Sequence, residues 1–383
     1  MTAFPLLTAS ISRSPAAVAA VAVAQGLPWL LFSLPVGAMV DRWDRRTVIV
    51  RVNAVRAVLV GGLAVALALD LVSLALLALV AFLMTAAEIV SDTASQALLP
   101  AVVPTTDLER ANGRLYAVQN ATIQFVGPPL GGLLFAVQRT VPFALDALSF
   151  VWAVIFLRRL PPMPRAASSG QPRRRLRTEI AEGLRFLAAR PVLRGLAIAV
   201  FAGNVFIEGF YAVFVLFALQ EIGVGPTGYG LLFAVFALGG ISGSAVAVPV
   251  KRLLGDGPAI LAGSGLSGLP LLALGLFPTV PVAAGALFLT GAAEGVWQVL
   301  TASLRQAVIP DRLLGRVLGA FRLTGRGAMF LGAAGAGALA EVAGLRAPAV
   351  AAGIGIPLTA LALTGLLSTA SIQRARAEPA GTG

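Results

Sequence analysis

The chain has 383 residues, of which 58% are hydrophobic and 12% are charged, whereas soluble domains carry about 25% charged residues; this excludes an ordinary water-soluble globular domain. Cysteine and histidine are absent, which excludes disulfides, thiolate catalysis and histidine metal sites, so any proton coupling must run through carboxylates. The net charge of +12 comes mainly from arginines between apolar runs, a pattern typical of membrane topology and not of nucleic-acid binding.

Residues 17–40 form the first full-length apolar run and contain no charged side chain. A helix of roughly 20 residues crosses a hydrocarbon core about 30 Å thick, and the run shows no strand-like alternation. Before it stands a stub, residues 2–11, which is too short to cross and lacks the features of a signal peptide. Ten more runs follow, at 48–69, 71–94, 115–137, 141–157, 194–220, 228–250, 258–277, 281–303, 321–342 and 347–369. We therefore predict an all-α membrane protein of eleven full helices and a stub.

Arginine is concentrated in every second connection between these runs. The connections after residues 40, 94, 157, 250 and 303 are rich in basic residues, which are arginines apart from Lys251. The alternate connections carry only Arg13, Arg139 and Arg346. Short loops rich in arginine stay in the cytoplasm. We expect both termini and the 158–193 loop to be cytoplasmic and the helices to cross the plasma (inner) membrane several times.

The sequence repeats itself at an offset of 206 residues. AVVPTTDLERANG at 101–113 aligns with AVIPDRLLGRVLG at 307–319, and the register extends to pair Glu88 with Glu294. Two six-helix halves in the same orientation are typical of parallel-repeat transporters. The expected domains are an N-terminal half, a cytoplasmic linker with an amphipathic helix, a C-terminal half and a cytoplasmic tail, at residues 1–159, 160–193, 194–370 and 371–383.

The repeat also bears on the N-terminus. The counterpart of the helix at 194–220 would begin about 15–20 positions before Met1. We therefore expect the first helix to be truncated in this sequence, by a start codon assigned too late.

The segment GAMVDRWDRR, residues 37–46, resembles the loop signature of the major facilitator superfamily. The resemblance implies a cytoplasmic latch, in which an arginine of this loop pairs with Glu88 or Asp92 on the fourth helix of the fold. The second half has Ala247 where Asp41 stands, so its latch is expected to be weaker. The alternative is a positive-inside loop with solvated acids. The candidate latch residues are Gly37, Asp41, Arg42, Arg45, Arg46, Glu88, Asp92 and Glu294.

The segment GPPLGG resembles the core of a signature in proton-coupled exporters of the same superfamily, with Gly127, Pro128, Gly131 and Gly132 as the matching residues. Proline kinks a helix and glycine allows close packing, so a generic packing helix is the alternative. The upstream glycines of the full signature are missing, because Arg114 and Ile123 stand there.

Four longer segments resemble, in their order and spacing, the subgroup of enterobactin exporters and macrolide efflux proteins. They are SQALLPAVVPTTDLERANG, GPPLGGLLF, PFALDALSF and EGLRFLAARPVLRGL. This resemblance implies proton-driven export of a drug or siderophore and does not fix the substrate.

Ionisable residues inside apolar helices are functional candidates, because a buried acid holds a proton until water reaches it. Glu208, beside Asn204 and Tyr211, is our first choice for the proton and substrate cavity. Glu88 and Glu294 are assigned to the latch, with a role as proton carriers as the alternative. Asp146 is a further cavity candidate that could instead cap its helix. Polar and aromatic candidates for the cavity are Asn120, Gln124, Trp297 and Gln298, with interhelical hydrogen bonds or interfacial anchoring as the alternative.

Together these observations indicate a secondary active transporter, a proton-coupled exporter of a small lipophilic molecule, drug or siderophore, working by alternating access. A passive facilitator or importer of the same fold, and a non-transporting sensor or inactive truncated relative, remain as alternatives. No phosphate-binding loop is present, which disfavours ATP-driven transport, and no nucleophile, metal or cofactor constellation points to an enzyme. We expect a monomer whose partners are the substrate, protons and the lipid bilayer.

Overall fold

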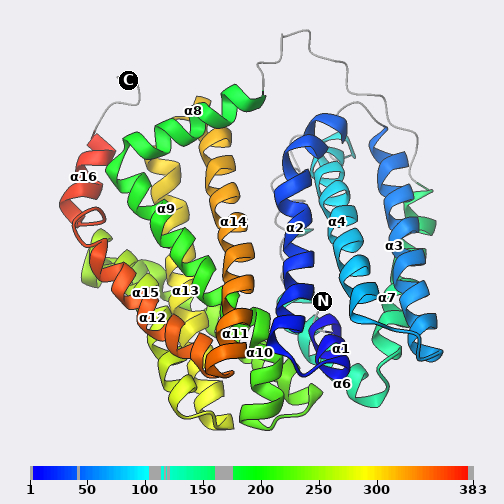
Figure 1. Cartoon of the computed structure of the whole chain (residues 1–383). Coiled ribbons are helices and arrows are strands. Elements are labelled where there is room, and N and C mark those ends of the chain that lie inside the picture. Colours follow the sequence, from blue (N-terminus) through cyan, green and yellow to red (C-terminus); the bar gives the residue numbers. More distant parts are fainter. Residues whose placement is uncertain are drawn as a thin grey trace. The chain divides into compact units, whose positions relative to one another are not determined.

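The computed structural model describes residues 3–40, 44–102, 114, 115, 118, 121–159 and 176–377, and every regular element in these ranges is a helix (Figure 1). Each of the eleven predicted apolar runs coincides with helix throughout most of its described residues. The prediction of an all-α protein is confirmed.

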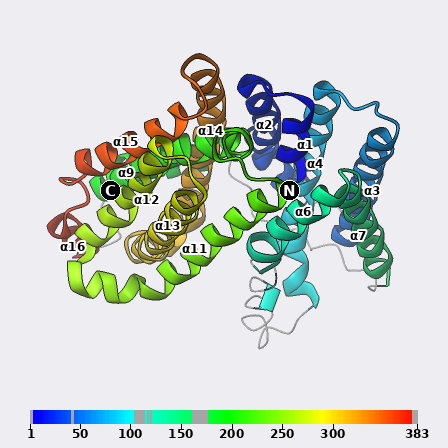
Figure 2. The ribbon, with the colours of Figure 1, turned by 90° about the horizontal axis from the view of Figure 1, so that it is seen from below.

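The chain divides into two compact units, of which unit 1 contains residues 1–170 and 225–231. Within unit 1, α2 packs against α4, and α3 packs against α4 and α7 (Figures 1 and 2). Its core buries Leu7, Val60, Leu63 and Leu77, and the edge of Phe4 meets the ring of Phe143 with 5.4 Å between centroids. Its helices are α1 Ala3–Ile11, α2 Pro15–Val40, α3 Arg45–Ala68, α4 Leu74–Val102, η2 Ala121–Val126, α6 Gly127–Val137 and α7 Val141–Leu157.

Unit 2 contains residues 171–224 and 232–383. Here α12 packs against both α13 and α15, and α14 packs against α8, α9, η3 and α10. Its helices are α8 Leu176–Ala189, α9 Pro191–Gly203, η3 Asn204–Glu208, α10 Gly209–Leu216, η4 Phe217–Ile222, most of α11 Pro226–Leu254, α12 Asp256–Leu276, α13 Val280–Val308, α14 Asp311–Ala343, α15 Ala347–Ala362 and α16 Thr369–Ala377.

By length and composition, seven helical stretches of the described chain are long and apolar enough to cross a membrane, and three shorter helices are also apolar. Large apolar side chains lie on the outside of these helices. Val58, Leu253 and Leu361 are 74%, 84% and 66% exposed. Water would not favour such a surface, whereas lipid tails solvate it, and the helices satisfy their own backbone groups as a bilayer requires.

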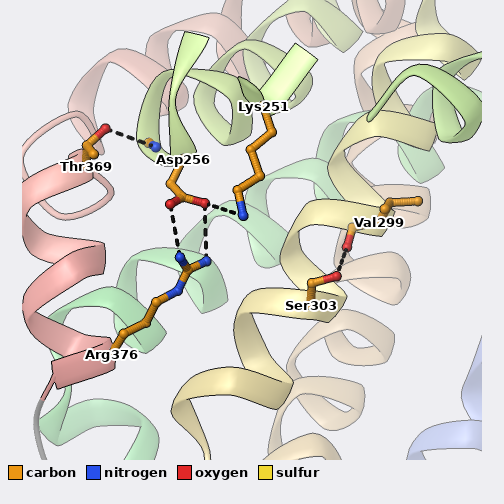
Figure 3. Close-up of polar contacts among 7 residues, drawn as sticks. Lys251, Asp256, Val299, Ser303, Thr369 and Arg376 are labelled. Carbon is orange, nitrogen blue, oxygen red and sulfur yellow. Dashed lines mark hydrogen bonds and ion pairs between the residues drawn. The ribbon is translucent and has the colours of Figure 1, made fainter. Parts of the chain in front are cut away.

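Ion pairs attach two short helices to unit 2. The predicted amphipathic linker helix is α8, and its Glu182 accepts from Nη1 of Arg316 on α14 at 2.8 Å. At α16, Arg376 donates to both oxygens of Asp256, at 3.0 and 3.2 Å, and Nζ of Lys251 lies 2.9 Å from the same carboxylate (Figure 3). Asp256 thereby joins the last described helix to the connection between α11 and α12.

Candidate functional site

Asn204 and Glu208 lie at the two ends of η3, a π-helical turn between α9 and α10. A π turn widens the helix and disturbs its regular ladder of hydrogen bonds, and such turns are frequent at functional sites. The side-chain amide of Asn204 donates to the carbonyl of Val200 at 2.8 Å, which satisfies a backbone group one turn earlier. The irregular turn is therefore stabilised by one of its own side chains.

Helix α14 approaches η3 closely enough to fix its position. A Cβ atom added at Gly332 would lie 2.3 Å from the carbonyl oxygen of Val205, and one added at Gly209 would lie 2.7 Å from the carbonyl oxygen of Gly332. The neighbouring atoms are backbone, so a larger residue cannot be accommodated by a rotamer change. Glycine at these positions lets the backbone of α14 support the turn that carries Glu208.

A cavity of about 220 Å³ lies beside η3 within unit 2. Ligand cavities are typically about 300–1,000 Å³, so this one would enclose one end of a drug-sized molecule. The lining is contributed mainly by α9, η3, α12 and α13. Its polar and aromatic members are Asn204, Glu208, Ser264, Ser267, Glu294, Trp297, Gln298 and Arg305.

The charged side chains of the cavity have different neighbours. Glu208 interacts electrostatically with Arg326 of α14, an opposite charge, whereas the charge acting on Glu294 is that of Glu208. Arg305 donates from Nε to the carbonyl of Thr301 at 3.2 Å, and its guanidinium lies 5.3 Å from the ring centre of Phe321. The two acids are thus near each other, but a cation balances only Glu208 among the described residues.

Of the predicted cavity residues, the structure brings together Asn204, Glu208, Trp297 and Gln298. Tyr211, on α10, packs in an aromatic cluster, and its buried hydroxyl has no hydrogen-bond partner among the described residues. The members of that cluster are Phe210, Phe214, Phe233 and Phe236.

Other cavity candidates lie elsewhere. Asp146 is exposed on α7 in unit 1, where its carbonyl accepts from Oγ of Ser149 at 2.7 Å. It is therefore not among the residues that line the cavity of unit 2. Asn120 and the side chain of Gln124 lie outside the described residues.

The sequence assigned Glu294 to the cytoplasmic latch, and the structure places it within its helix and not at a helix end. It lies midway along α13 and lines the cavity. Helices α4 and α13 are both 29 residues long, and Glu88 and Glu294 occupy matching positions in them, as the 206-residue register predicts.

In the first half, only part of the proposed latch can be followed. Arg46 donates to the carbonyls of Leu157, at 3.3 Å, and Arg158 at the end of α7. Glu88 is half-buried and Asp92 exposed on successive turns of α4. Asp41, Arg42 and the side-chain surroundings of Gly37 and Arg45 lie outside the described residues.

The GPPLGG segment forms the first turns of α6 and packs within unit 1 against residues 225–231. A Cβ atom at Gly132 would lie 2.4 Å from the carbonyl oxygen of Pro226, and one at Gly230 would lie 2.3 Å from that of Pro128. Gly127 begins the helix, and Gly131 is half-buried beside this contact. The motif therefore serves close helix packing here.

Sequence reasoning missed four residues around the cavity: Ser264, Ser267, Arg305 and Arg326. Serines are common in apolar helices and give little signal. Arg305 lies just beyond the predicted end of its segment at 303, because α13 is longer than its apolar run. Arg326, inside the predicted run 321–342, could have been found by the rule that singled out Glu208.

Comparison with known proteins gives matches over nearly the whole chain. The family model described as a transmembrane secretion effector matches residues 2–377. The multidrug efflux pump Tap of Mycolicibacterium fortuitum is 29% identical over 359 residues, covering 90% of this chain and 86% of the relative. The enterobactin exporter EntS of Salmonella choleraesuis is 28% identical over 352 residues, covering 90% of this chain and 81% of that relative.

Solved structures with the same fold include a bacterial homologue of the lysosomal transporter Spinster. Its TM-score is 0.74 at 16% identity, covering 98% of this chain and 94% of that one. A bacterial homologue of the iron transporter ferroportin, in an inward-facing state, gives a TM-score of 0.71 at 18% identity. The match covers 96% of this chain and 95% of that one. At these identities the likeness concerns the fold alone.

Proposed function

Because this chain belongs to the transmembrane secretion effector family of major facilitator transporters, we propose that it exports a small lipophilic molecule, a drug or siderophore, in exchange for protons. It is an integral membrane transport protein by family and by its apolar helices. The names of the relatives, a multidrug efflux pump and an enterobactin exporter, supply the substrate classes of this proposal.

The observation that carries the proton coupling is the position of Glu208. It is an acid on an irregular turn inside an apolar stretch, and it lines a cavity that also contains Asn204 and Trp297. In such a place a carboxylate takes up a proton when the cavity is dry and loses it when water enters. Without histidine or cysteine, carboxylates are the groups available for this task.

In the proposed cycle, substrate and proton occupy the cavity in turn as it meets each aqueous phase. At a membrane potential of 100 mV, one inward proton contributes about 2.3 kcal/mol, enough for roughly a fortyfold solute gradient. We further propose that both termini and residues 158–193 are cytoplasmic, and that the loop around Asp41 forms the cytoplasmic latch.

We predict that expression of the chain lowers the accumulation of a lipophilic dye in cells that lack their own exporters. An uncoupler should restore accumulation to the level of cells with an empty vector, because it removes the proton gradient. Dye fluorescence measured before and after the uncoupler tests this. Efflux that continues unchanged after the uncoupler would instead identify a passive facilitator.

A further inference from the structure

Glu294 also lines the cavity, and the proton exchange proposed for Glu208 assigns it no role. Its Oε1 atom is buried and has no hydrogen-bond partner in the part of the chain that the structure describes. The charge acting on it is that of Glu208, another acid, and the hydroxyl of Tyr211 on α10 also interacts with it electrostatically. Arg305, the cation on the same helix, lies three turns further on, about 16 Å along the axis.

A buried carboxylate oxygen without a partner is unfavourable, because it has lost its hydration and no hydrogen bond replaces it. Two species can relieve this: a proton on the carboxyl group, or a cation beside the carboxylate. Glu208 differs, since Arg326 already acts on it with the opposite charge. The two acids of one cavity are therefore suited to different tasks.

Trp297 lies one helical turn after Glu294 on α13 and lines the same cavity. The face of tryptophan attracts cations more strongly than that of tyrosine or phenylalanine, and the attraction increases when the cation is desolvated. The cavity volume of about 220 Å³ suits one end of a molecule, with its apolar remainder outside. A carboxylate and an indole on one helical face thus form a site for a positive group.

We propose that Glu294 and Trp297 bind the positively charged, amine-bearing end of a lipophilic cargo. This rests on the proposed export function and narrows its substrate class to lipophilic cations. The cation binds while Glu294 is ionised. Protonation of the same carboxylate removes the attraction and releases the cation, so proton and cargo compete at this residue.

The experiment measures binding of 4-phenylbutylamine, a lipophilic amine that is positively charged at neutral pH, to the purified full-length chain, with 4-phenylbutanol as an uncharged probe of similar shape. We expect Glu294→Gln to weaken cation binding about tenfold or more, because it removes one charge interaction in a desolvated site. Glu294→Asp keeps the charge and should retain most of the binding, as should Glu341→Gln at the exposed end of α14. Binding of the uncharged probe should be the same in all of these proteins.

Two further variants keep the test independent of how well Glu294→Gln folds. Trp297→Leu should weaken cation binding several-fold, and Trp297→Phe, which keeps an aromatic face, should weaken it less. Lowering the pH should weaken binding to the unmodified chain. Absence of cation binding to the unmodified chain would overturn the assignment of this site to Glu294 and Trp297. Equal binding by the unmodified chain and a folded Glu294→Gln variant would do the same.

The outcome for the subsite is separable from that for export. If a proton gradient drives efflux of an uncharged dye such as Nile red from liposomes while 4-phenylbutylamine does not bind, the proposed cation site at Glu294 is wrong and the proposed function stands. If the cation binds through Glu294 and no gradient-driven efflux of any probe occurs, the subsite stands and the proposed function is wrong.

Discussion

Glu208→Gln is expected to abolish the proton movement that substrate elicits in liposomes, down to the level of liposomes without protein. Glutamine has nearly the same shape as glutamate and cannot exchange a proton, so the variant removes the proposed coupling group and little else. A pH-sensitive dye in the liposome lumen measures the effect after substrate is added outside. The unfolding temperature in detergent should stay within a few degrees of the unmodified chain, since Glu208 lies in a cavity and not in a packed core.

Two outcomes bear on this prediction. Glu341→Gln, which removes an exposed acid from α14, is the matched control and should exchange protons normally. A Glu208→Gln variant that exchanges protons as fast as this control would show that the assignment of Glu208 is wrong.

Gly332→Ala is expected to destabilise unit 2 by about 1–3 kcal/mol and to lower transport strongly. The new methyl group would lie 2.3 Å from the carbonyl oxygen of Val205, so the backbone of η3 must move and carry Glu208 with it. The unfolding temperature and the rate of proton exchange both report the change.

Gly335→Ala is the matched control on the same helix. A Cβ atom at Gly335 has no neighbour within 4 Å, and alanine is favoured over glycine in a helix by about 1 kcal/mol. This variant should be as stable as the unmodified chain or slightly more so. Equal loss of stability in both variants would mean that the contact with η3 does not govern the effect.

Much of the fold could be predicted from the sequence, because the bilayer constrains it strongly. Apolar runs of about 20 residues have few alternatives to a helix in lipid. The resemblance of residues 37–46 and 127–132 to the major facilitator superfamily, and of the longer segments to the exporter subgroup, is confirmed by the family match and the relatives. Helix ends were less predictable: α13 and α14 extend well beyond their apolar runs.

The candidate site could be predicted only in part. Glu208 stood out because a charge inside an apolar run is costly. The π turn that places Asn204 and Glu208 at one cavity leaves no periodic signal, since it depends on the approach of α14 at Gly332. Glu294 is also a charge inside an apolar run. The side chains that surround it depend on which helices pack together, and the spacing of residues in the sequence does not reveal this.

The measurement that tests the central claim most directly is transport in liposomes with an imposed pH gradient. If the chain exchanges protons for a lipophilic substrate, the gradient alone should drive the substrate to a concentration difference that reverses when the gradient is reversed. A substrate that reaches the same concentration on both sides, whatever the direction of the gradient, would contradict proton-coupled export.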